Sequence, residues 1–329
     1  AASDVCKEQG KENTSSGISG LHYGLWKANA EVGELAAIDA TMREIPYRTG
    51  YVMKRWKKGI DVELCKEEGN YNLERLRTIV LLEADYNTNC KKIGRDALYS
   101  AELQATDPSA IAPEQYGSRK RHRAAEVCLN MKLVDDLLRQ MRRAGAICSN
   151  DAKSCYDRII HAVLSICLQR IGMSENPIRS TLETLQQLQH HIHTAFGDSE
   201  DFYEASPGQP LQGVVQGNGG GPTGWGSVST PVINMMRTAG YGFQHWTSLT
   251  NQVLQIVCFA FVDDADLPHT SHLEATGEDI MAEMQDVLDT WEGGITATGG
   301  ALVPKKSYWY LIDFKCGTTG KWSYRKQSE

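Results

Sequence analysis

The sequence lacks the features that mark exported, membrane-spanning and disulfide-stabilised proteins. Its 329 residues contain no apolar run long enough to cross a bilayer, and the opening residues AASDVCKEQGKENTSSG have no apolar signal core. The nine cysteines are scattered and form no CxxC pair, which argues against a disulfide framework and against a zinc site. We therefore expect an intracellular protein with reduced, mostly buried thiols and no membrane partner.

The sequence also lacks an excess of basic residues. Its formal net charge is −7, which counts against a nucleic-acid partner, because proteins that bind nucleic acids present Lys and Arg to the phosphate backbone. The basic residues are clustered, however, within residues 54–58 and again within residues 119–143. Whole-chain charge does not determine the charge of one face, so a nucleic-acid partner stays open.

No internal repeat or low-complexity linker is present, and the composition is that of a soluble globular protein, with 41% hydrophobic and 23% charged residues. Periodicity predicts interleaved helices and strands, so the fold class is α/β or α+β. We expect helices over residues 30–56, 91–103, 121–143, 152–171, 177–196, 222–240 and 273–291. We expect strands at the start of residues 76–89, over residues 144–151, as a hairpin in residues 202–215, around residues 256–270 and in residues 307–324.

Asp263 and Asp264 form the most informative pair of residues. They follow an unbroken apolar run, residues 256–262, and precede a second short extended stretch. The pattern predicts a buried strand, a tight turn with two acids and a return strand. Two carboxylates at such a turn need neutralisation, for which a divalent cation is suited. The alternative is an ordinary solvated turn.

A third acid, Asp151, ends the predicted strand in ICSNDAKSCYD, and Tyr156 follows five residues later. Two metal ions about 4 Å apart need carboxylates that converge from separate elements, as one strand-end acid and a neighbouring Asp-Asp hairpin would provide. The alternative for Asp151 alone is a helix N-cap.

A glycine-rich segment, GVVQGNGGGPTGWG, lies between these acids at residues 213–226. Gly217, Gly219 and Gly220 permit close approach to the backbone, and Pro222 suits the first turn of a helix. The segment lacks the Lys of a phosphate-binding P-loop. It could pack against a base pair or a template backbone, and a flexible surface loop is an equal alternative.

The order SNDAKSCYD, GVVQGNGGGP and FAFVDD resembles the palm of reverse transcriptases, particularly those of non-LTR retrotransposons and group II introns. Further segments agree in order, so the resemblance covers roughly residues 15–310. SSGISGLHYGLWK resembles the N-terminal family motif, and EQYGSRKRHRA, with Gln115, Gly117 and Arg119, resembles a fingers motif. TATGGALVPKKSYW resembles the segment that carries a basic residue near the incoming nucleotide.

The chain departs from the family pattern at three positions. In LRTIVLLEADYN, which resembles the fingers segment that carries Arg77, Thr78 stands where the family has Pro and Asn87 where it has Lys. In the glycine-rich segment, Val215 replaces the usual Pro.

The resemblance implies an α+β fold of right-hand polymerase type. We expect a polar lead-in at residues 1–14, fingers at residues 15–143, and a palm at residues 144–310 with a small antiparallel sheet packed on helices. Residues 311–329 would form a tail at the start of a thumb, and we expect the thumb itself to be absent from the sequence. No endonuclease, RNase H or zinc-knuckle segment is visible.

The resemblance also implies RNA-directed DNA polymerase activity in a retroelement enzyme of the cytoplasm or nucleus. Its partners would be an RNA template, a DNA or RNA primer and dNTPs, and no stable protein partner is predictable. Asp151, Asp263 and Asp264 would be the catalytic residues and metal ligands for two Mg²⁺ ions, with Mn²⁺ as an alternative. The implied nucleotide-binding residues are Arg77, Arg119, Tyr156 (which would exclude the ribose 2′-OH), Gln216, Gly217, Lys305 and Lys306; the implied nucleic-acid contacts are Gly219, Gly220, Pro222 and Trp225.

Two other readings of the whole chain stay open. One is a catalytically silent or repurposed nucleic-acid-binding remnant of a retroelement, against which the intact acids and Tyr156 argue. The other is an RNA-directed RNA polymerase palm, which shares the metal acids but usually has a small polar residue as its sugar gate.

Three local features have structural alternatives. His190, His191 and His193 could bind a metal, but no ligand lies beside them at suitable spacing, so we expect a polar helix surface. Trp225 could stack on a base or pack in the core. The basic helix at residues 121–143 could follow a phosphate backbone or present an ordinary solvated face.

Overall fold

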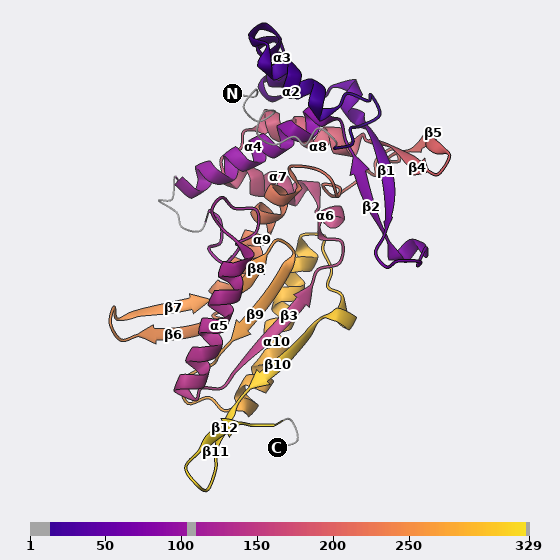
Figure 1. Ribbon diagram of the computed structural model, residues 1–329. Helices are drawn as coiled ribbons and strands as arrows, with labels where there is room; N and C mark the ends of the chain where they lie inside the picture. Colours follow the sequence, from indigo (N-terminus) through magenta and orange to yellow (C-terminus); the bar gives the residue numbers. More distant parts are fainter. Residues whose placement is uncertain (1–13, 104–109, 327–329) are drawn as a thin grey trace. The chain divides into compact units, whose positions relative to one another are not determined.

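The computed structural model describes residues 14–103 and 110–326 and shows a mixed α+β chain (Figure 1). It divides into two compact units, each made from two stretches of sequence. Unit 1 comprises Ala1–Ala101 and Tyr156–Gly224, and unit 2 comprises Glu102–Cys155 and Trp225–Glu329. The predicted boundaries of fingers and palm stay predictions, and the predicted lead-in lies almost wholly outside the described residues.

Unit 1 is built on a four-stranded sheet with the strand order β2-β1-β4-β5. Strand β1 (Lys58–Cys65) pairs antiparallel with β2 (Leu76–Leu81) and parallel with β4 (Gln189–Thr194). Strand β5 (Gly197–Tyr203) forms an antiparallel hairpin with β4. The parallel pair joins segments that are more than a hundred residues apart in the sequence.

The described residues of unit 1 also form helices. They are α2 (Tyr23–Glu31), α3 (Gly33–Thr49), α4 (Ala84–Leu103), α6 (Cys155–Arg158), α7 (His161–Arg170) and α8 (Glu175–Gln186), with short 3₁₀ turns at η1 (Lys54–Lys57) and η2 (Leu73–Arg75). Helix α3 ends at Gly50, whose φ of 71° is the left-handed conformation that favours glycine after a helix. Trp56 and Tyr86, with ring centroids 5.1 Å apart, belong to the core that joins η1, β2 and α4.

Unit 2 is built on a fully antiparallel sheet with the order β10-β3-β9-β8. Its strands are β3 (Gly145–Asp151), β8 (Phe259–Phe261), β9 (Asp264–His269) and β10 (Tyr308–Ile312). Helix α10 (Gly277–Ala297) contacts β3 and β10, and a capping box between Thr276 and Asp279 closes its N-terminus.

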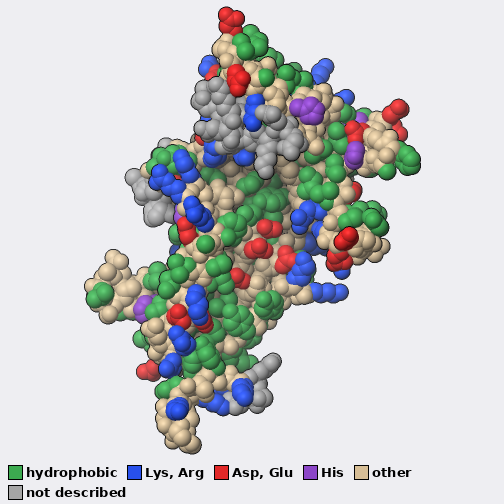
Figure 2. All heavy atoms as spheres, viewed as in Figure 1, with side chains coloured by type: hydrophobic (Ala, Val, Ile, Leu, Met, Phe, Trp, Pro, Cys, Tyr) green, Lys and Arg blue, Asp and Glu red, His purple; other side chains and the backbone are tan. Residues whose placement is uncertain are grey.

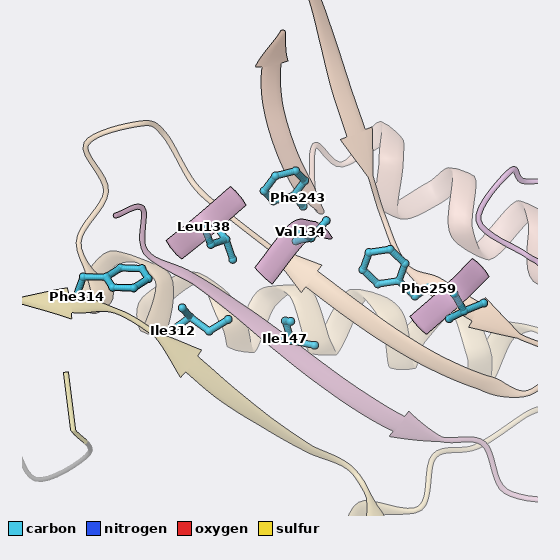
Figure 3. Packing of buried hydrophobic residues seen from close by; sticks show 8 residues of the cluster. Val134, Leu138, Ile147, Phe243, Phe259, Ile312 and Phe314 are labelled. Atoms are coloured by element: carbon cyan, nitrogen blue, oxygen red, sulfur yellow. The ribbon is translucent and has the colours of Figure 1, made fainter. Parts of the chain in front are cut away.

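Helix α5 (Ala124–Met141), which confirms the helix predicted at residues 121–143, packs on this sheet through apolar side chains. Figure 3 shows Val134 and Leu138 of α5 against Ile147 of β3 and Phe259 of β8. Each of these four side chains is at most 3% exposed. The sheet that carries Asp151 and Asp264 therefore has a close-packed, rigid support.

The remaining elements of unit 2 are two short ribbons and two helical segments. β6 (Phe243–Thr247) pairs with β7 (Gln252–Ile256), and β11 (Phe314–Cys316) pairs with β12 (Trp322–Tyr324). Helix α9 (Gly221–Thr238) starts in unit 1 and continues in unit 2, and η3 (Pro304–Lys306) precedes β10.

Several predicted elements are confirmed: the basic amphipathic helix, the strand that ends at Asp151, the Asp-Asp hairpin and the small-residue helix after the glycine-rich segment. The helix predicted over residues 177–196 is wrong beyond Gln186, because the chain turns at Leu188 and enters β4. Parallel pairing with β1 overrides the local helical pattern there. The hairpin predicted in residues 202–215 is also wrong: β5 ends at Tyr203, and only an isolated bridge between Ser206 and Gln209 follows.

Several helix boundaries differ from the prediction. The helix expected over residues 152–171 is split into α6 and α7, and the one expected over residues 273–291 begins at Gly277 and ends at Ala297. The long N-terminal helix is broken at Val32 and ends at Thr49, and α4 begins at Ala84 rather than near Lys91. All cysteines in the described parts of the chain are free thiols, and most of them are buried, as predicted. No helix within those parts is long and apolar enough to cross a membrane.

Candidate active site

Strand pairing in unit 2 brings three acids to one end of its sheet. Asp151, the last residue of β3, is the register partner of Asp264, the first residue of β9. Asp263 lies in the turn that joins β8 to β9. Burial and the charges of Asp263, Asp151 and Asp266 raise the pKa of Asp264 above its ordinary value. Acidic side chains gather over the ends of β3 and β9 in Figure 2.

The turn before Asp263 is held in an unusual conformation by Gln115. Val262 has a φ of 62°, which is rare for a β-branched residue. The Gln115 amide binds both sides of this residue: Oε1 accepts from the Val262 N–H at 3.0 Å, and Nε2 donates to the Val262 carbonyl at 3.1 Å. The Trp225 indole N–H donates to the same carbonyl. Gln115 and Trp225 are 1% and 4% exposed, so both position the turn from inside the unit.

Gly117 allows this arrangement. A Cβ at position 117 would lie 2.2 Å from the Val262 nitrogen, so a side chain would push the turn away. The Gly117 N–H also donates to Gln115 Oε1 at 3.0 Å. The motif EQYG thus fixes the conformation of the turn that carries Asp263, through the hydrogen bonds of Gln115 and the close approach of Gly117.

The backbone of Asp151 is fixed by the segment around η3. The Val303 N–H donates to the Asp151 carbonyl at 2.9 Å, and the Asp151 N–H donates to Ser307 Oγ at 3.4 Å. Lys306 Nζ lies 2.8 Å from Asp151 Oδ2. Lys306 therefore neutralises part of the acidic charge, and Lys305 beside it is exposed.

The three acids offer hard carboxylate oxygens, the ligand type that Mg²⁺ prefers. The pKa of Asp264 is raised first by burial and then by the neighbouring carboxylates, both of which disfavour its charged form. Among residues 14–103 and 110–326, no three His, Cys, Asp or Glu side chains already form a metal-binding group. The donor chemistry fits a divalent cation, and the carboxylates would have to converge from their present positions to bind it.

The glycine-rich segment is fixed to β2 and α4 within unit 1. The Val80 N–H donates to the Gln216 carbonyl at 2.8 Å, and the Gln216 side chain donates to Asp157 Oδ2 at 3.2 Å. Gly217 has a φ of 108°, and a Cβ there would lie 2.6 Å from the Val80 carbonyl oxygen. The segment is therefore a docked loop, in which glycine is required at position 217.

Asn87 completes this attachment. Its side chain donates to the Gly217 carbonyl at 3.0 Å and accepts from the Gly219 N–H. A Cβ at Gly219 would lie 2.7 Å from the Asn87 carbonyl oxygen, and one at Gly220 would lie 3.2 Å from Cys90 Cβ. The residue that departs from the family's Lys is thus a structural clamp on the glycine-rich segment.

Tyr156 is the first residue of the second stretch of unit 1, and it follows directly after the strand and turn that carry Asp151. A Cβ at Gly221 would meet the Tyr156 ring at 3.3 Å, so this glycine leaves room for the ring. The Val214 N–H donates to the Tyr156 carbonyl at 2.7 Å, and Pro222 follows in the first turn of α9. The ring is half-buried.

The two predicted phosphate-binding arginines differ in their surroundings. Arg77 is exposed on β2 of unit 1. Arg119, in unit 2, pairs with Glu102 at 2.7 Å and donates to the carbonyls of residues 112, 113 and 115. Its side chain is 13% exposed, and its contacts hold the loop that supplies Gln115. Phosphate contacts of both arginines stay predictions.

The histidines predicted to lie on a polar helix surface are instead in β4. His190 and His191 are each 6% exposed, and His190 Nδ1 lies 2.9 Å from Asp61 Oδ1. The Tyr203 hydroxyl donates to the other Asp61 oxygen. His190 thus belongs to a polar network with Asp61 and Tyr203, and His191 Nδ1 lies 2.9 Å from the Ser199 carbonyl, so structural contacts account for both buried histidines.

Sequence reasoning missed the roles of Gln115 and Asn87 in positioning the site. Both were visible within recognisable motifs, but their partners are the backbones of residues more than a hundred positions away. Gly117, two residues after Gln115, was the available signal in the sequence for a close backbone approach.

Neither a protein-family model nor a curated protein matches this sequence. A solved structure of telomerase from Candida albicans, in complex with a TWJ fragment of telomeric RNA, is similar in fold. The TM-score is 0.52 and the identity 14%, over 90% of this chain and 48% of the telomerase chain. This chain therefore spans about half the length of that protein, and the likeness between the two is one of fold.

Proposed function

We propose that this chain is the core of an RNA-directed DNA polymerase, a nucleotidyltransferase that adds dNTPs to a primer 3′-OH on an RNA template. The observation that carries the proposal is the meeting of Asp151, Asp263 and Asp264 at one end of the sheet in unit 2. The telomerase-like fold supports it. A retroelement origin, with unit 2 as most of a palm, is part of the same proposal.

The three carboxylates would hold two Mg²⁺ ions. When bound, Mg²⁺ supplies charge that activates the primer hydroxyl and stabilises the pyrophosphate leaving group. Asp151 and Asp263 would be the main residues to hold the metal ions, and Asp264 would support them. Gln115 and Trp225 are positioning residues, because they hold the turn on which Asp263 lies.

Lys306 has two tasks in this proposal. Without a cation it neutralises Asp151. If Asp151 held a metal ion instead, the Lys306 ammonium would be available to phosphate oxygens of the incoming nucleotide through charge-assisted hydrogen bonds. Arg77 is the proposed phosphate contact in unit 1, and Lys305 adds positive charge beside Lys306.

Tyr156 would select dNTPs over rNTPs by occupying the volume of a ribose 2′-OH. Its ring position depends on Gly221, which leaves space for it. Gln216 and Gly217 would contact the nucleotide, while Gly219, Gly220 and Pro222 would approach the template. Cytoplasmic or nuclear action follows from the proposed activity.

The deciding experiment is primer extension on an RNA template with dNTPs and Mg²⁺, using the wild-type chain and Asp263→Asn. We expect extension with wild type and loss of at least a hundredfold with the variant. Absence of extension by a wild-type chain that binds the template-primer would instead support a catalytically silent nucleic-acid-binding remnant. Preferred use of rNTPs would support an RNA-directed RNA polymerase.

A further inference from the structure

Helix α3 carries an apolar stripe that no other described part of the chain covers. Leu35, Ile38, Met42 and Ile45 are 45%, 58%, 53% and 43% exposed. Their spacing of three, four and three residues is the a/d pattern of a helix that packs on another helix. The spacing of these four side chains is therefore typical of a helix–helix interface, yet all four are exposed to solvent.

The stripe is separate from the face by which α3 packs in unit 1. Arg43 and Pro46 are the buried residues of α3, and the Arg43 guanidinium lies 4.8 Å over the Trp26 ring of α2. Leu35, Ile38 and Met42 border a recess of about 140 Å³, which Trp26 also lines. Its lining also includes the charged side chains of Asp39, Arg43, Arg55 and Asp85, so the stripe forms the apolar border of the recess.

The flanks of the stripe identify the partner. With Leu35 and Met42 at a and Ile38 and Ile45 at d, Glu34, Thr41 and Arg48 take the flanking g positions. In an antiparallel pair of two α3 helices, Leu35 packs against Ile45 of the other copy and Ile38 against Met42. The same alignment places Glu34 opposite Arg48 and Thr41 opposite its own counterpart.

We infer that α3 is a self-association surface that pairs two copies of this chain in an antiparallel, two-fold symmetric helix pair. Symmetry forms the Glu34–Arg48 pair twice, so both the apolar and the charged parts of the stripe are self-complementary. A parallel pair would instead set Glu34 near Asp39 of the other copy, with like charges facing. The chemistry of the stripe thus favours a second copy in one orientation.

Two features of α3 bear on this arrangement. Asp39 would lie near its counterpart, but its carboxylate is 13% exposed and is bound by Arg43 Nε at 2.9 Å, which neutralises the repulsion. Arg48 lies 2.8 Å from Glu44 on the same helix, and both side chains are largely exposed. A surface pair of this kind is weak, so Arg48 can also contact Glu34 of the other copy.

Sedimentation velocity of the 329-residue chain tests the proposal, over roughly 1 to 100 µM because one helix pair forms a small interface. We expect a concentration-dependent dimer. Ile38→Asp should weaken the association at least about a hundredfold, because it places a charge at the centre of the stripe. Ile166→Asp is the matched control: Ile166 is a 69% exposed isoleucine of α7 and should leave the dimer unchanged.

A charge exchange tests the orientation. Glu34→Arg and Arg48→Glu should each weaken the dimer about tenfold at low salt, because each puts like charges opposite one another twice. The double variant should restore the dimer, and high salt should remove the difference among the three.

A wild-type chain that stays monomeric at about 100 µM overturns the proposal, as does a dimer that is insensitive to Ile38→Asp. Failure of the double variant to recover overturns the antiparallel pairing. Far-ultraviolet circular dichroism of each variant checks that α3 and the rest of the chain stay folded, and the exposed charge variants test the surface even if Ile38→Asp unfolds. None of these readouts depends on polymerase activity.

Discussion

Removal of the Gln115 side chain should release the turn that carries Asp263 while the sheet beneath it stays folded. Gln115 is 1% exposed, and its side chain takes part in four hydrogen bonds of unit 2. Two of them satisfy the N–H groups of Gly117 and Val262, and a third binds the Val262 carbonyl. Val262 has a φ of 62°, so its conformation depends on such outside support.

The cost of Gln115→Ala follows from these contacts. Each net hydrogen bond contributes about 1 kcal/mol, and a buried N–H left without a partner costs about 1–3 kcal/mol. The Val262 carbonyl keeps the Trp225 indole as a donor, which limits the loss. Water entering the space of the missing side chain limits it further. We expect about 3 kcal/mol of local destabilisation, which is a large fraction of the stability of a typical domain.

Hydrogen exchange of the Val262 and Gly117 amides measures this effect directly. A loss of about 3 kcal/mol should speed their exchange by roughly a hundredfold, while amides in the middle of β3 and β9 change little. Primer extension should lose turnover (kcat) more than nucleotide affinity (KM), because the misplaced group is Asp263. Gln169→Ala is the control, since Gln169 is exposed and its side chain donates one hydrogen bond, to Ser165 Oγ at 3.2 Å.

The reasoning would be refuted by unchanged exchange at Val262 and Gly117 in Gln115→Ala. Uniform acceleration across all of unit 2 would also refute it, because that result would make Gln115 a general stability residue. Gln115→Glu separates the two tasks of the amide: it keeps the acceptor for both N–H groups but loses the donor to the Val262 carbonyl, so its exchange rates should lie between those of wild type and Gln115→Ala.

Three further changes should have effects of predictable sign. Burial and neighbouring carboxylates raise the pKa of Asp264, so the native chain binds this proton more tightly than the unfolded chain does, and stability falls as pH rises through the window above the unfolded pKa of about 3.9. Asp264→Asn should therefore stabilise the chain against urea at pH 7, with a gain that shrinks toward pH 4; a gain that grew on acidification would contradict this sign. Gly217→Ala should destabilise unit 1 by about 2 kcal/mol, because the φ of residue 217 is 108° and the new Cβ would lie 2.6 Å from the Val80 carbonyl oxygen. Gly226→Ala is the control: a Cβ there would enter open space within α9, so the variant should gain about 1 kcal/mol of stability. Equal urea midpoints for the two variants would count against the close approach at Gly217. Phe259→Ala, which empties a 2% exposed core position, should cost about 3–5 kcal/mol in the same assay, and a loss below about 1 kcal/mol would mean that the core is not close-packed there.

Local patterns in the sequence were sufficient for much of the fold. The stripe of Val134 and Leu138 predicts α5, and the apolar run before Asp263 predicts a buried hairpin, because side-chain periodicity follows directly from helix and strand geometry. The same patterns failed at residues 187–194, where a histidine-rich stretch continues a helical pattern and yet forms β4. Its partner β1 lies far away in the sequence, and no local rule contains that pairing.

The candidate site divides in the same way. The sequence singled out Asp151, Asp263 and Asp264 through the order of the motifs that carry them, since residue type alone left a solvated turn and a helix N-cap as alternatives. Only tertiary structure set Asp151 in register with Asp264, and it alone gave Gln115 and Asn87 their tasks. Register and backbone hydrogen bonds depend on which distant strands and loops meet. The exposed stripe of α3 is the clearest case: its spacing is plain in the sequence, but its exposure became evident only once the chain had folded.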